Sequence, residues 1–207
     1  MSNNFNLVAP LYDRLGDLVY GGDIQASQDE YLHLLPEEGF LLFIGGGSGQ
    51  TLRKIIKIKP RLKVYYLDAS SRMMEICKKL IPTKDQERIE FKIGTENEIP
   101  PHYHFDAVIT FYFLDLFRED RKERIFEKIH KHLKQDGIWL QADFLPAKGL
   151  ISLIREKIMF LFFKLFSRIE ANGIEEDQKL FKDKNYKQLQ KRLFHKKQIY
   201  SAVFQKT

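Results

Sequence analysis

Three glycines at every second position form the feature of this sequence best suited to chemistry. Gly45, Gly47 and Gly49 directly follow the apolar run 41–44, and helical spacing resumes over residues 48–58. Glycine tolerates a positive φ and lets the backbone approach a bound molecule. The free N–H groups at a helix start also attract negative charge, by roughly 0.3–1 kcal/mol. The junction therefore predicts a ligand site between a buried strand and a helix.

The spacing of these glycines excludes two common nucleotide motifs. A dinucleotide fingerprint in the register of Gly45 and Gly47 needs a third glycine where Gln50 stands. No Lys-Ser or Lys-Thr pair follows, as a phosphate-cradling loop would require. The ligand is therefore expected to lack a pyrophosphate held by this loop.

An acidic residue ends the next predicted strand. Residues 63–67 form a short β-type run that ends at Asp68, and residues 69–71 precede and cap a helix predicted over about 72–81. In a βαβ unit, Asp68 would lie at the carboxyl edge of the strand beside the glycines. A carboxylate there can accept two hydrogen bonds from the hydroxyls of a ribose. The pair therefore predicts a nucleoside site.

This order of features resembles the Rossmann-like class I S-adenosylmethionine-dependent methyltransferases. Residues 89–100 resemble the family's third strand and adenine-side loop, residues 105–115 its fourth strand and active-site turn, and residues 133–143 its fifth strand. The resemblance covers about residues 40–144. It departs from the family at Phe43, where an acidic residue is common, and at Thr95, where an Asp commonly lies beside the adenine.

The resemblance implies S-adenosylmethionine as the cofactor and no metal. It places the methionine moiety at the glycine loop, the ribose on Asp68, and the adenine between Ala69 and Met73 on one side and residues 94–96 at its far edge. The implied cofactor-binding residues are Tyr12, Gly45, Gly46, Gly47, Gly49, Asp68, Ala69, Met73, Gly94, Thr95, Glu96 and Thr110.

The implied reaction is in-line displacement of the sulfonium methyl group. Alignment of donor and acceptor can supply up to roughly 7–11 kcal/mol, so the protein mainly has to orient the reactants and exclude water. A general base helps only some acceptors. The candidates at the strand ends are Tyr112, Asp115 and Asp143. Asp115 and Asp143 are equally read as structural groups, because an unpaired carboxylate in an apolar run is costly.

The expected acceptor is a small molecule of apolar or aromatic character. The fourth strand ends in residues 110–113, Thr-Phe-Tyr-Phe, and lacks the Asn/Asp-Pro-Pro-aromatic turn that resembles base-modifying enzymes. Nucleic acid is therefore not the expected substrate. The alternatives are a lipid or quinone methyltransferase at the membrane surface, or a non-catalytic S-adenosylmethionine-binding protein.

The amino-terminal segment supports a particular branch of the family. Residues 8–13 contain Ala-x-x-Tyr-Asp, which resembles the small-molecule methyltransferases of ubiquinone and menaquinone biosynthesis. The resemblance puts Tyr12 near the methionine end of the cofactor, with Tyr20 at the same entrance. Both tyrosines are equally read as anchors of two short helices over residues 7–35, the second opened by a Ser27-x-x-Glu30 capping box.

Composition predicts one domain. With 207 residues and 43% hydrophobic content, the chain can bury a full α/β core. The resemblance implies a Rossmann-like seven-stranded mixed sheet of order 3-2-1-4-5-7-6, with the last strand antiparallel and helices on both faces. Its predicted parts are a helical cap (1–36), a cofactor-binding core (40–144), an apolar helical insertion after the fifth strand (148–172), and a helix with a hairpin (174–207).

Two segments leave several interpretations open. Residues 150–169 are rich in phenylalanine but hold five charges, which argue against a membrane span. This segment is read as a lid, as core or homodimer contact, or as a membrane-surface helix. The basic run 182–197 can meet the phosphates of nucleic acid or anionic lipid, or form a solvated edge strand with Lys-rich ends.

The remaining residue types favour the cytoplasm. Cys77 is the single cysteine, which excludes an internal disulfide and suits a reducing compartment. Residues 1–6 hold neither a positive leader nor an apolar signal core. The six histidines form no metal-ligand spacing with Cys77 or with one another.

Overall fold

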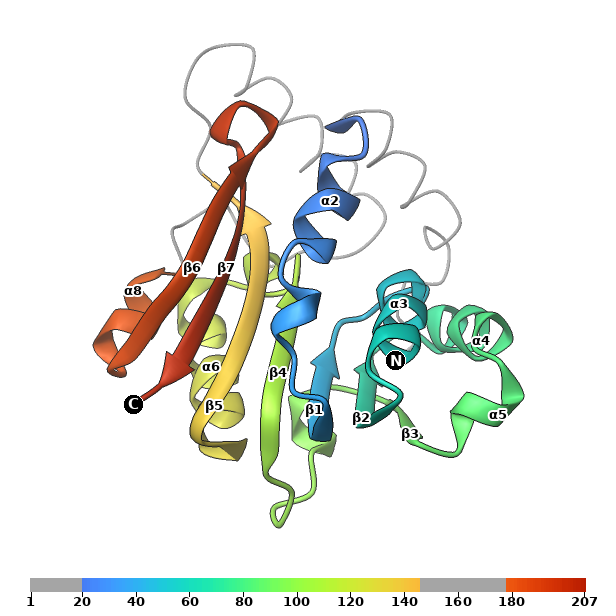
Figure 1. Ribbon diagram of the computed structural model, residues 1–207. Coiled ribbons are helices and arrows are strands. Elements are labelled where there is room, and N and C mark those ends of the chain that lie inside the picture. Colours follow the sequence, from blue (N-terminus) through green and yellow to red (C-terminus); the bar gives the residue numbers. More distant parts are fainter. Residues whose placement is uncertain (1–19, 146–177) are drawn as a thin grey trace.

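The computed structural model describes residues 20–145 and 178–207 (Figure 1). The predictions on Tyr12, on most of the amino-terminal cap and on the apolar insertion 148–172 lie outside these residues. Within them, the predicted sheet is confirmed: seven strands run in the order β3-β2-β1-β4-β5-β7-β6. The five strands from β3 to β5 are parallel, and β7 is antiparallel to both β5 and β6.

The strands follow the predicted apolar runs closely. Their bounds are β1 Glu38–Ile44, β2 Arg61–Asp68, β3 Ile89–Ile93, β4 Phe105–Phe111, β5 Leu133–Phe144, β6 Tyr186–Phe194 and β7 Ile199–Lys206. The central strands β1, β4 and β5 are buried along most of their length, because helices cover both faces of the parallel part. The final hairpin is confirmed with β7 one residue longer than predicted.

Helices pack on both faces of the sheet, so the buried residues form two clusters, one on each face. Their bounds are α2 Asp23–Asp29, α3 Gln50–Ile58, α4 Ser71–Leu80, α5 Thr83–Gln86, α6 Glu119–His132 and α8 Gln178–Asp183, with short 3₁₀ turns η1 Leu32–Leu34, η2 Glu96–Glu98, η3 Leu114–Leu116 and η4 His195–Lys197. Residues of α3 and α4 join one buried cluster, and residues of α6 and α8 join the other. The apolar spacing of α3 (Leu52, Ile55, Ile56) and α6 (Ile125, Phe126, Ile129) explains why each buries one face.

Of the two helix caps predicted from the sequence, the one at Ser70 is confirmed and the one at Ser27 is not. Ser70 is the N-cap of α4, and its hydroxyl accepts a hydrogen bond from Met73 N (3.1 Å), as expected for this residue type. The predicted capping box at Ser27 is wrong. Helix α2 starts earlier, after Gly22 with φ +85°, so Ser27 lies inside the helix and is buried. Its hydroxyl donates back to Ile24 O (2.7 Å), the bond that serine makes in a helix interior.

No helix in residues 20–145 and 178–207 has the length and apolar content needed to cross a membrane.

Candidate functional site

The three predicted glycines form a loop at the carboxyl end of β1. Gly45, Gly47 and Gly49 have φ values of +70°, +63° and +86°, which other L-residues rarely adopt. Gly49 is the N-cap of α3, and Gly45 N donates to Leu67 O on β2 (2.8 Å). The sheet's hydrogen-bond ladder therefore continues from β1 into the loop.

Each glycine of this loop meets a different neighbour. A Cβ on Gly45 would lie 2.6 Å from the Phe113 ring, and a Cβ on Gly49 would lie 2.4 Å from the Cys77 sulfur. A Cβ on Gly47 would meet no atom of residues 20–145 or 178–207 within 4 Å. The loop is therefore packed against the protein at its two ends and open at Gly47, where a ligand can approach the backbone.

Gly46 is packed as tightly as the ends of the loop. A Cβ there would lie 2.3 Å from the Tyr66 ring, whose hydroxyl donates to Gly47 O (3.0 Å). Tyr66 on β2 therefore packs against the loop and holds it by this hydrogen bond. The sequence did not predict this contact, because Tyr66 lies in an apolar run. Phe43, which replaces an acidic residue of the family pattern, lies in the core against the rings of Tyr66 and Phe111.

Asp68 ends β2 beside the glycine loop, as predicted from the βαβ geometry. Its Oδ2 accepts from Gly47 N (2.9 Å), and its Oδ1 accepts from Ser70 N (2.8 Å). Burial raises the pKa of the Asp68 carboxyl, although the two N–H bonds favour the ionised form. A carboxylate has about four acceptor positions, so capacity remains for ribose hydroxyls. The sequence pointed to that ribose contact but not to the structural role of Asp68 in holding the loop.

The turn after β3 lies next to Asp68. Gly94, with φ +150°, donates its N–H to Asp68 O (2.9 Å), and the Thr95 hydroxyl accepts from Asn97 N (3.4 Å) at the start of η2. Glu96 is buried and forms a two-pronged ion pair with Arg121 of α6, with distances of 2.7 and 2.9 Å. The carboxylate of Glu96 is thus held by α6, a partner that the sequence did not suggest.

The residues predicted to flank the adenine lie at the start of α4. Ala69 and Met73 are half-buried, which leaves part of each side chain accessible beside Asp68. Met73 N is held by the Ser70 hydroxyl, so this first turn is fixed by its cap. The adenine contacts of these residues stay predictions.

Thr110 has its side chain in the core. The residue is fully buried, and its hydroxyl accepts from the indole Nε1 of Trp139 on β5 (2.8 Å). A contact between Thr110 and the ligand would therefore have to come from its backbone. The pairing with Trp139 satisfies two polar groups that would otherwise be buried without partners.

The three candidate bases occupy different surroundings. Tyr112 follows β4 and is buried, with its hydroxyl 2.6 Å from the Ser27 hydroxyl of α2. Asp143 is buried within β5 opposite Tyr200, and its Oδ1 accepts from Phe144 N (3.0 Å). Asp115 is half-buried in η3. These surroundings favour structural roles for Tyr112 and Asp143.

Cys77 and the acidic and imidazole groups suggest no other chemistry here. Burial raises the pKa of the Cys77 thiol to about 12, so it is neutral and unreactive at physiological pH. Among the residues that the structure describes, no three His, Cys, Asp or Glu side chains gather in a way that could hold a metal ion.

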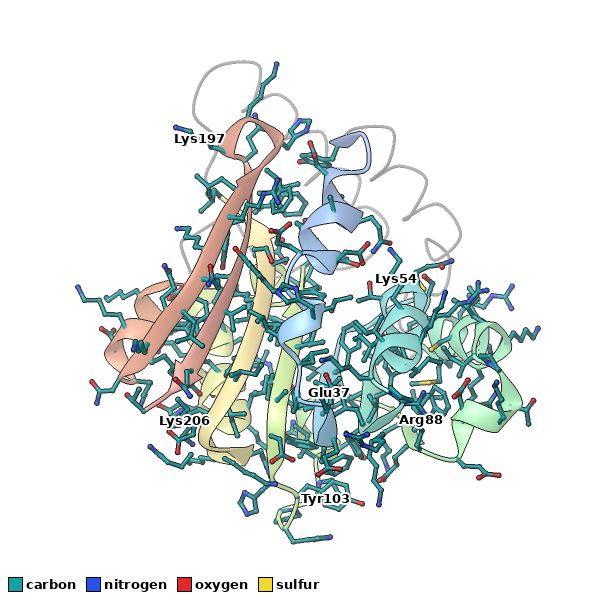
Figure 2. All side chains as sticks on the ribbon, viewed as in Figure 1. Glu37, Lys54, Arg88, Tyr103, Lys197 and Lys206 are labelled. Atoms are coloured by element: carbon teal, nitrogen blue, oxygen red, sulfur yellow. The ribbon has the colours of Figure 1, made fainter. Side chains whose placement is uncertain are left out.

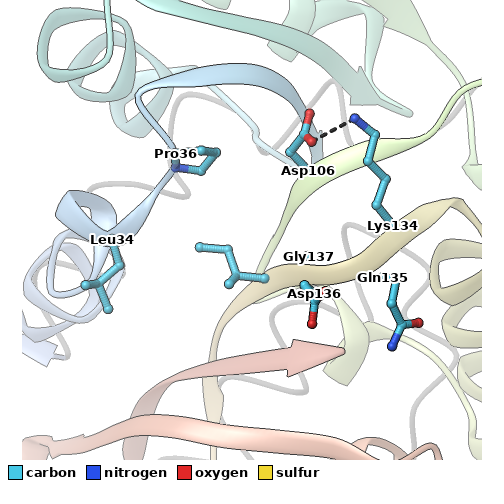
Figure 3. A pocket seen from close by; sticks show the side chains of 8 residues that line it. Leu34, Pro36, Asp106, Lys134, Gln135, Asp136 and Gly137 are labelled. Atoms are coloured by element: carbon cyan, nitrogen blue, oxygen red, sulfur yellow. Dashed lines mark hydrogen bonds and ion pairs between the residues drawn. The ribbon is translucent and has the colours of Figure 1, made fainter. Parts of the chain in front are cut away.

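A pocket of about 360 Å³ lies at the opposite end of the sheet (Figure 3). Its lining comes from the segment before β1 and from the first residues of β4 and β5, and includes the ion pair between Asp106 and Lys134 (2.7 Å). The glycine loop and Asp68 lie at the carboxyl ends of the strands, which is where open α/β sheets bind ligands. The pocket is therefore separate from the candidate site.

Comparison with known proteins finds a domain model and curated relatives that this chain resembles. A family model described as a methyltransferase domain matches residues 42–139. A demethylmenaquinone methyltransferase of Thermotoga maritima is 28% identical over 147 residues, covering 69% of this chain and 60% of the relative. A polyamine aminopropyltransferase of Pyrobaculum aerophilum is 28% identical over 117 residues, covering 50% of this chain and 40% of the relative. The chain thus spans about half the length of these curated relatives.

A solved structure shows the same fold. The N-methyltransferase NodS of Bradyrhizobium japonicum, in complex with S-adenosyl-L-homocysteine, has a TM-score of 0.65 at 14% identity, with 88% of this chain and 85% of that chain covered. The matched domain model runs from β1 into β5, and these are the strands that carry the glycine loop, Asp68 and the turn after β4. Over this region the chain therefore resembles a methyltransferase domain in sequence, and it shares the Rossmann-like fold of a solved methyltransferase.

Proposed function

We propose that the protein transfers the methyl group of S-adenosylmethionine to a small apolar or aromatic acceptor. The observation that carries the proposal is the open backbone at Gly47, held by the carboxylate that would also bind the ribose. A cofactor can approach Gly47 without displacing any atom of the described part of the chain, and Asp68 keeps acceptor capacity for the cofactor's hydroxyls. The residues present therefore fit this cofactor.

The cofactor itself would supply an activated methyl group, so the protein has to bind, orient and exclude water. The glycine loop would hold the methionine moiety with backbone groups, and Asp68 the ribose. The N–H bonds from Gly47 and Ser70 already fix the Asp68 carboxylate, so little reorganisation is needed on binding.

Aromatic rings at the ends of β4 and β5 support an apolar acceptor. The Phe144 ring lies 4.8 Å from the Tyr112 ring and 5.2 Å from the Tyr20 ring, measured between centroids. Phe113 and Phe117, which follow β4, form a second pair at 5.1 Å. The first three rings are buried, whereas Phe113 and Phe117 are half-buried, and such partly accessible rings would favour a flat or greasy molecule over a charged one.

Calorimetric titration with S-adenosylmethionine, S-adenosylhomocysteine and NAD tests the proposal. We expect both sulfur nucleosides to bind and NAD to fail, because Gln50 removes the third glycine of the dinucleotide motif. Protein that is folded by circular dichroism yet binds none of the three would contradict the proposal. A subsequent screen of phenols, quinols and lipids by mass spectrometry would separate methyl transfer from aminopropyl transfer, the activity in the name of one relative.

Strand β6 favours a second candidate, a methyltransferase that works at an anionic membrane surface. All seven residues from Lys187 to Leu193 are exposed, and Leu189 and Leu193 are 40% and 42% exposed among the lysines. The hairpin tip with Lys197 lies at the end of the sheet opposite Tyr103, which precedes β4 (Figure 2). The basic strand therefore extends toward the end of the sheet that carries the candidate site.

Vesicle flotation tests this second candidate. If β6 meets anionic lipid, Lys187→Glu/Lys191→Glu should abolish flotation with vesicles of phosphatidylglycerol and phosphatidylcholine, because each lysine near such a surface contributes about 1 kcal/mol. Lys57→Glu/Lys79→Glu makes the same change of net charge at exposed positions of α3 and α4 and should leave flotation intact. Equal losses in the two variants, or no flotation of the unmodified protein, would leave only the first candidate.

A further inference from the structure

The backbone at the end of β4 adopts an unusual conformation. Tyr112, the first residue after the strand, has φ +50°, a region that bulky L-residues rarely occupy. Such a conformation persists only where the surrounding structure enforces it, and it is concentrated at functional sites.

Contacts with two elements hold Tyr112. Its N–H donates to Ala142 O on β5 (2.8 Å), which continues the β4–β5 ladder by one residue. Its ring packs on Phe144, and its hydroxyl lies 2.6 Å from the Ser27 hydroxyl of α2. Helix α2 thus has a direct, fully buried link to the turn after β4.

The direction of this hydrogen bond follows from the number of protons. The Ser27 hydroxyl has one proton and donates it to Ile24 O (2.7 Å). With the Ser27 proton in that bond, the bond between the two hydroxyls can use the Tyr112 proton, with Ser27 as acceptor. A phenol that donates to a buried serine is poorly placed to take a proton from an acceptor molecule.

The next residue links the same turn to the cofactor loop. Tyr112 belongs to the buried cluster on the α3 and α4 face of the sheet, whereas Phe113 packs with the cluster on the α6 face. The Phe113 ring fills the space beside Gly45, where a Cβ would lie 2.6 Å from its Cδ2. Two consecutive aromatic side chains therefore fix the turn on opposite faces of the sheet.

We propose that the Ser27–Tyr112 hydrogen bond positions the turn after β4 against the glycine loop, so that Tyr112 is a positioning residue for cofactor binding rather than a base. This inference rests on the proposed function. The bond from Ser27 to Tyr112 ties the turn after β4 to α2. The position of α2 on the sheet therefore determines where the next residue, Phe113, packs beside Gly45. Loss of the bond frees the turn to relax, which changes the wall of the cofactor site without touching the ligand.

The test compares variants of the two hydroxyls by calorimetric titration with S-adenosylhomocysteine. Tyr112→Phe and Ser27→Ala should each weaken binding by about 3- to 10-fold, the effect of one buried hydrogen bond. The double variant should be no weaker than the single ones, because both remove the same bond. Tyr186→Phe is the matched control. Tyr186 begins β6, and its hydroxyl forms a hydrogen bond with His130 Nδ1 of α6 (3.0 Å). We expect this variant to bind S-adenosylhomocysteine as tightly as the unmodified protein.

The outcomes separate the two proposals. Folded Tyr112→Phe and Ser27→Ala proteins with the affinity of the unmodified protein would overturn the positioning role while the proposed function stands. Additive losses in the double variant would also overturn it, because the two hydroxyls would then act separately. An unmodified protein that does not bind S-adenosylhomocysteine would refute the proposed function itself.

Discussion

Replacement of Asp68 by asparagine is expected to weaken S-adenosylhomocysteine binding by about 10- to 100-fold. The carboxylate accepts backbone N–H bonds from Gly47 and Ser70 through different oxygens. Asparagine has a single side-chain oxygen, so its NH₂ group would face one of these N–H groups. The substitution would therefore loosen the loop and also remove negative charge from the predicted ribose contact. Calorimetric titration measures the change in affinity.

Asp106→Asn is the matched control for this effect. Asp106 also accepts a backbone N–H bond, from Phe40 (2.8 Å), but it lies at the opposite end of the sheet beside the pocket of Figure 3. We expect its replacement to leave the affinity unchanged. If Asp68→Asn protein binds S-adenosylhomocysteine as tightly as the unmodified protein, the assignment of Asp68 to the ribose is wrong.

Gly49→Ala is expected to lower the free energy of unfolding by about 2–5 kcal/mol. The positive φ at Gly49 costs any other L-residue about 1–2 kcal/mol, and overpacking of a tight site typically costs about 1–3 kcal/mol. Overpacking applies because the new Cβ would lie 2.4 Å from the Cys77 sulfur and 3.2 Å from its Cα, and a backbone atom cannot move aside locally. Urea denaturation followed by circular dichroism measures the loss.

Gly47→Ala separates the needs of the fold from those of the ligand. Its φ is also positive, but its Cβ would enter open space, so only the conformational cost of about 1–2 kcal/mol applies. The added methyl group would point to where the ligand should approach, so the affinity for S-adenosylhomocysteine should fall more than stability does. Equal destabilisation by Gly47→Ala and Gly49→Ala would contradict this division of roles.

Most features that sequence reasoning predicted correctly are encoded by local pattern. Apolar runs of the right length, glycines at a strand end and a serine before a helix are each read within a few residues, and they predicted the strands, the loop and the Ser70 cap. The order of the strands in the sheet followed instead from the resemblance to a known fold. The position of Asp68 followed because the βαβ unit has a fixed geometry. The capping box at Ser27 failed because Gly22 starts α2 earlier.

The interactions that the sequence did not reveal join residues far apart along the chain. The Glu96–Arg121 ion pair, the Thr110–Trp139 hydrogen bond and the Ser27–Tyr112 bond span 25, 29 and 85 residues. Which partners meet depends on how α2 and α6 are seated on the sheet, and no periodic pattern encodes this. The partners of Glu96, Thr110 and Tyr112 therefore could not be predicted from the sequence, whereas the conformation of the glycine loop could.

The main-chain bonds from Gly45 to β2 and from Gly94 to Asp68 have an evolutionary consequence. Both sides of the predicted nucleoside site are prolongations of the sheet, built from amide groups that every residue type carries. Drift in side chains cannot erase such a scaffold as long as the glycines keep their φ angles. Related chains can therefore differ widely in their side chains, while the backbone that would hold the donor keeps its shape.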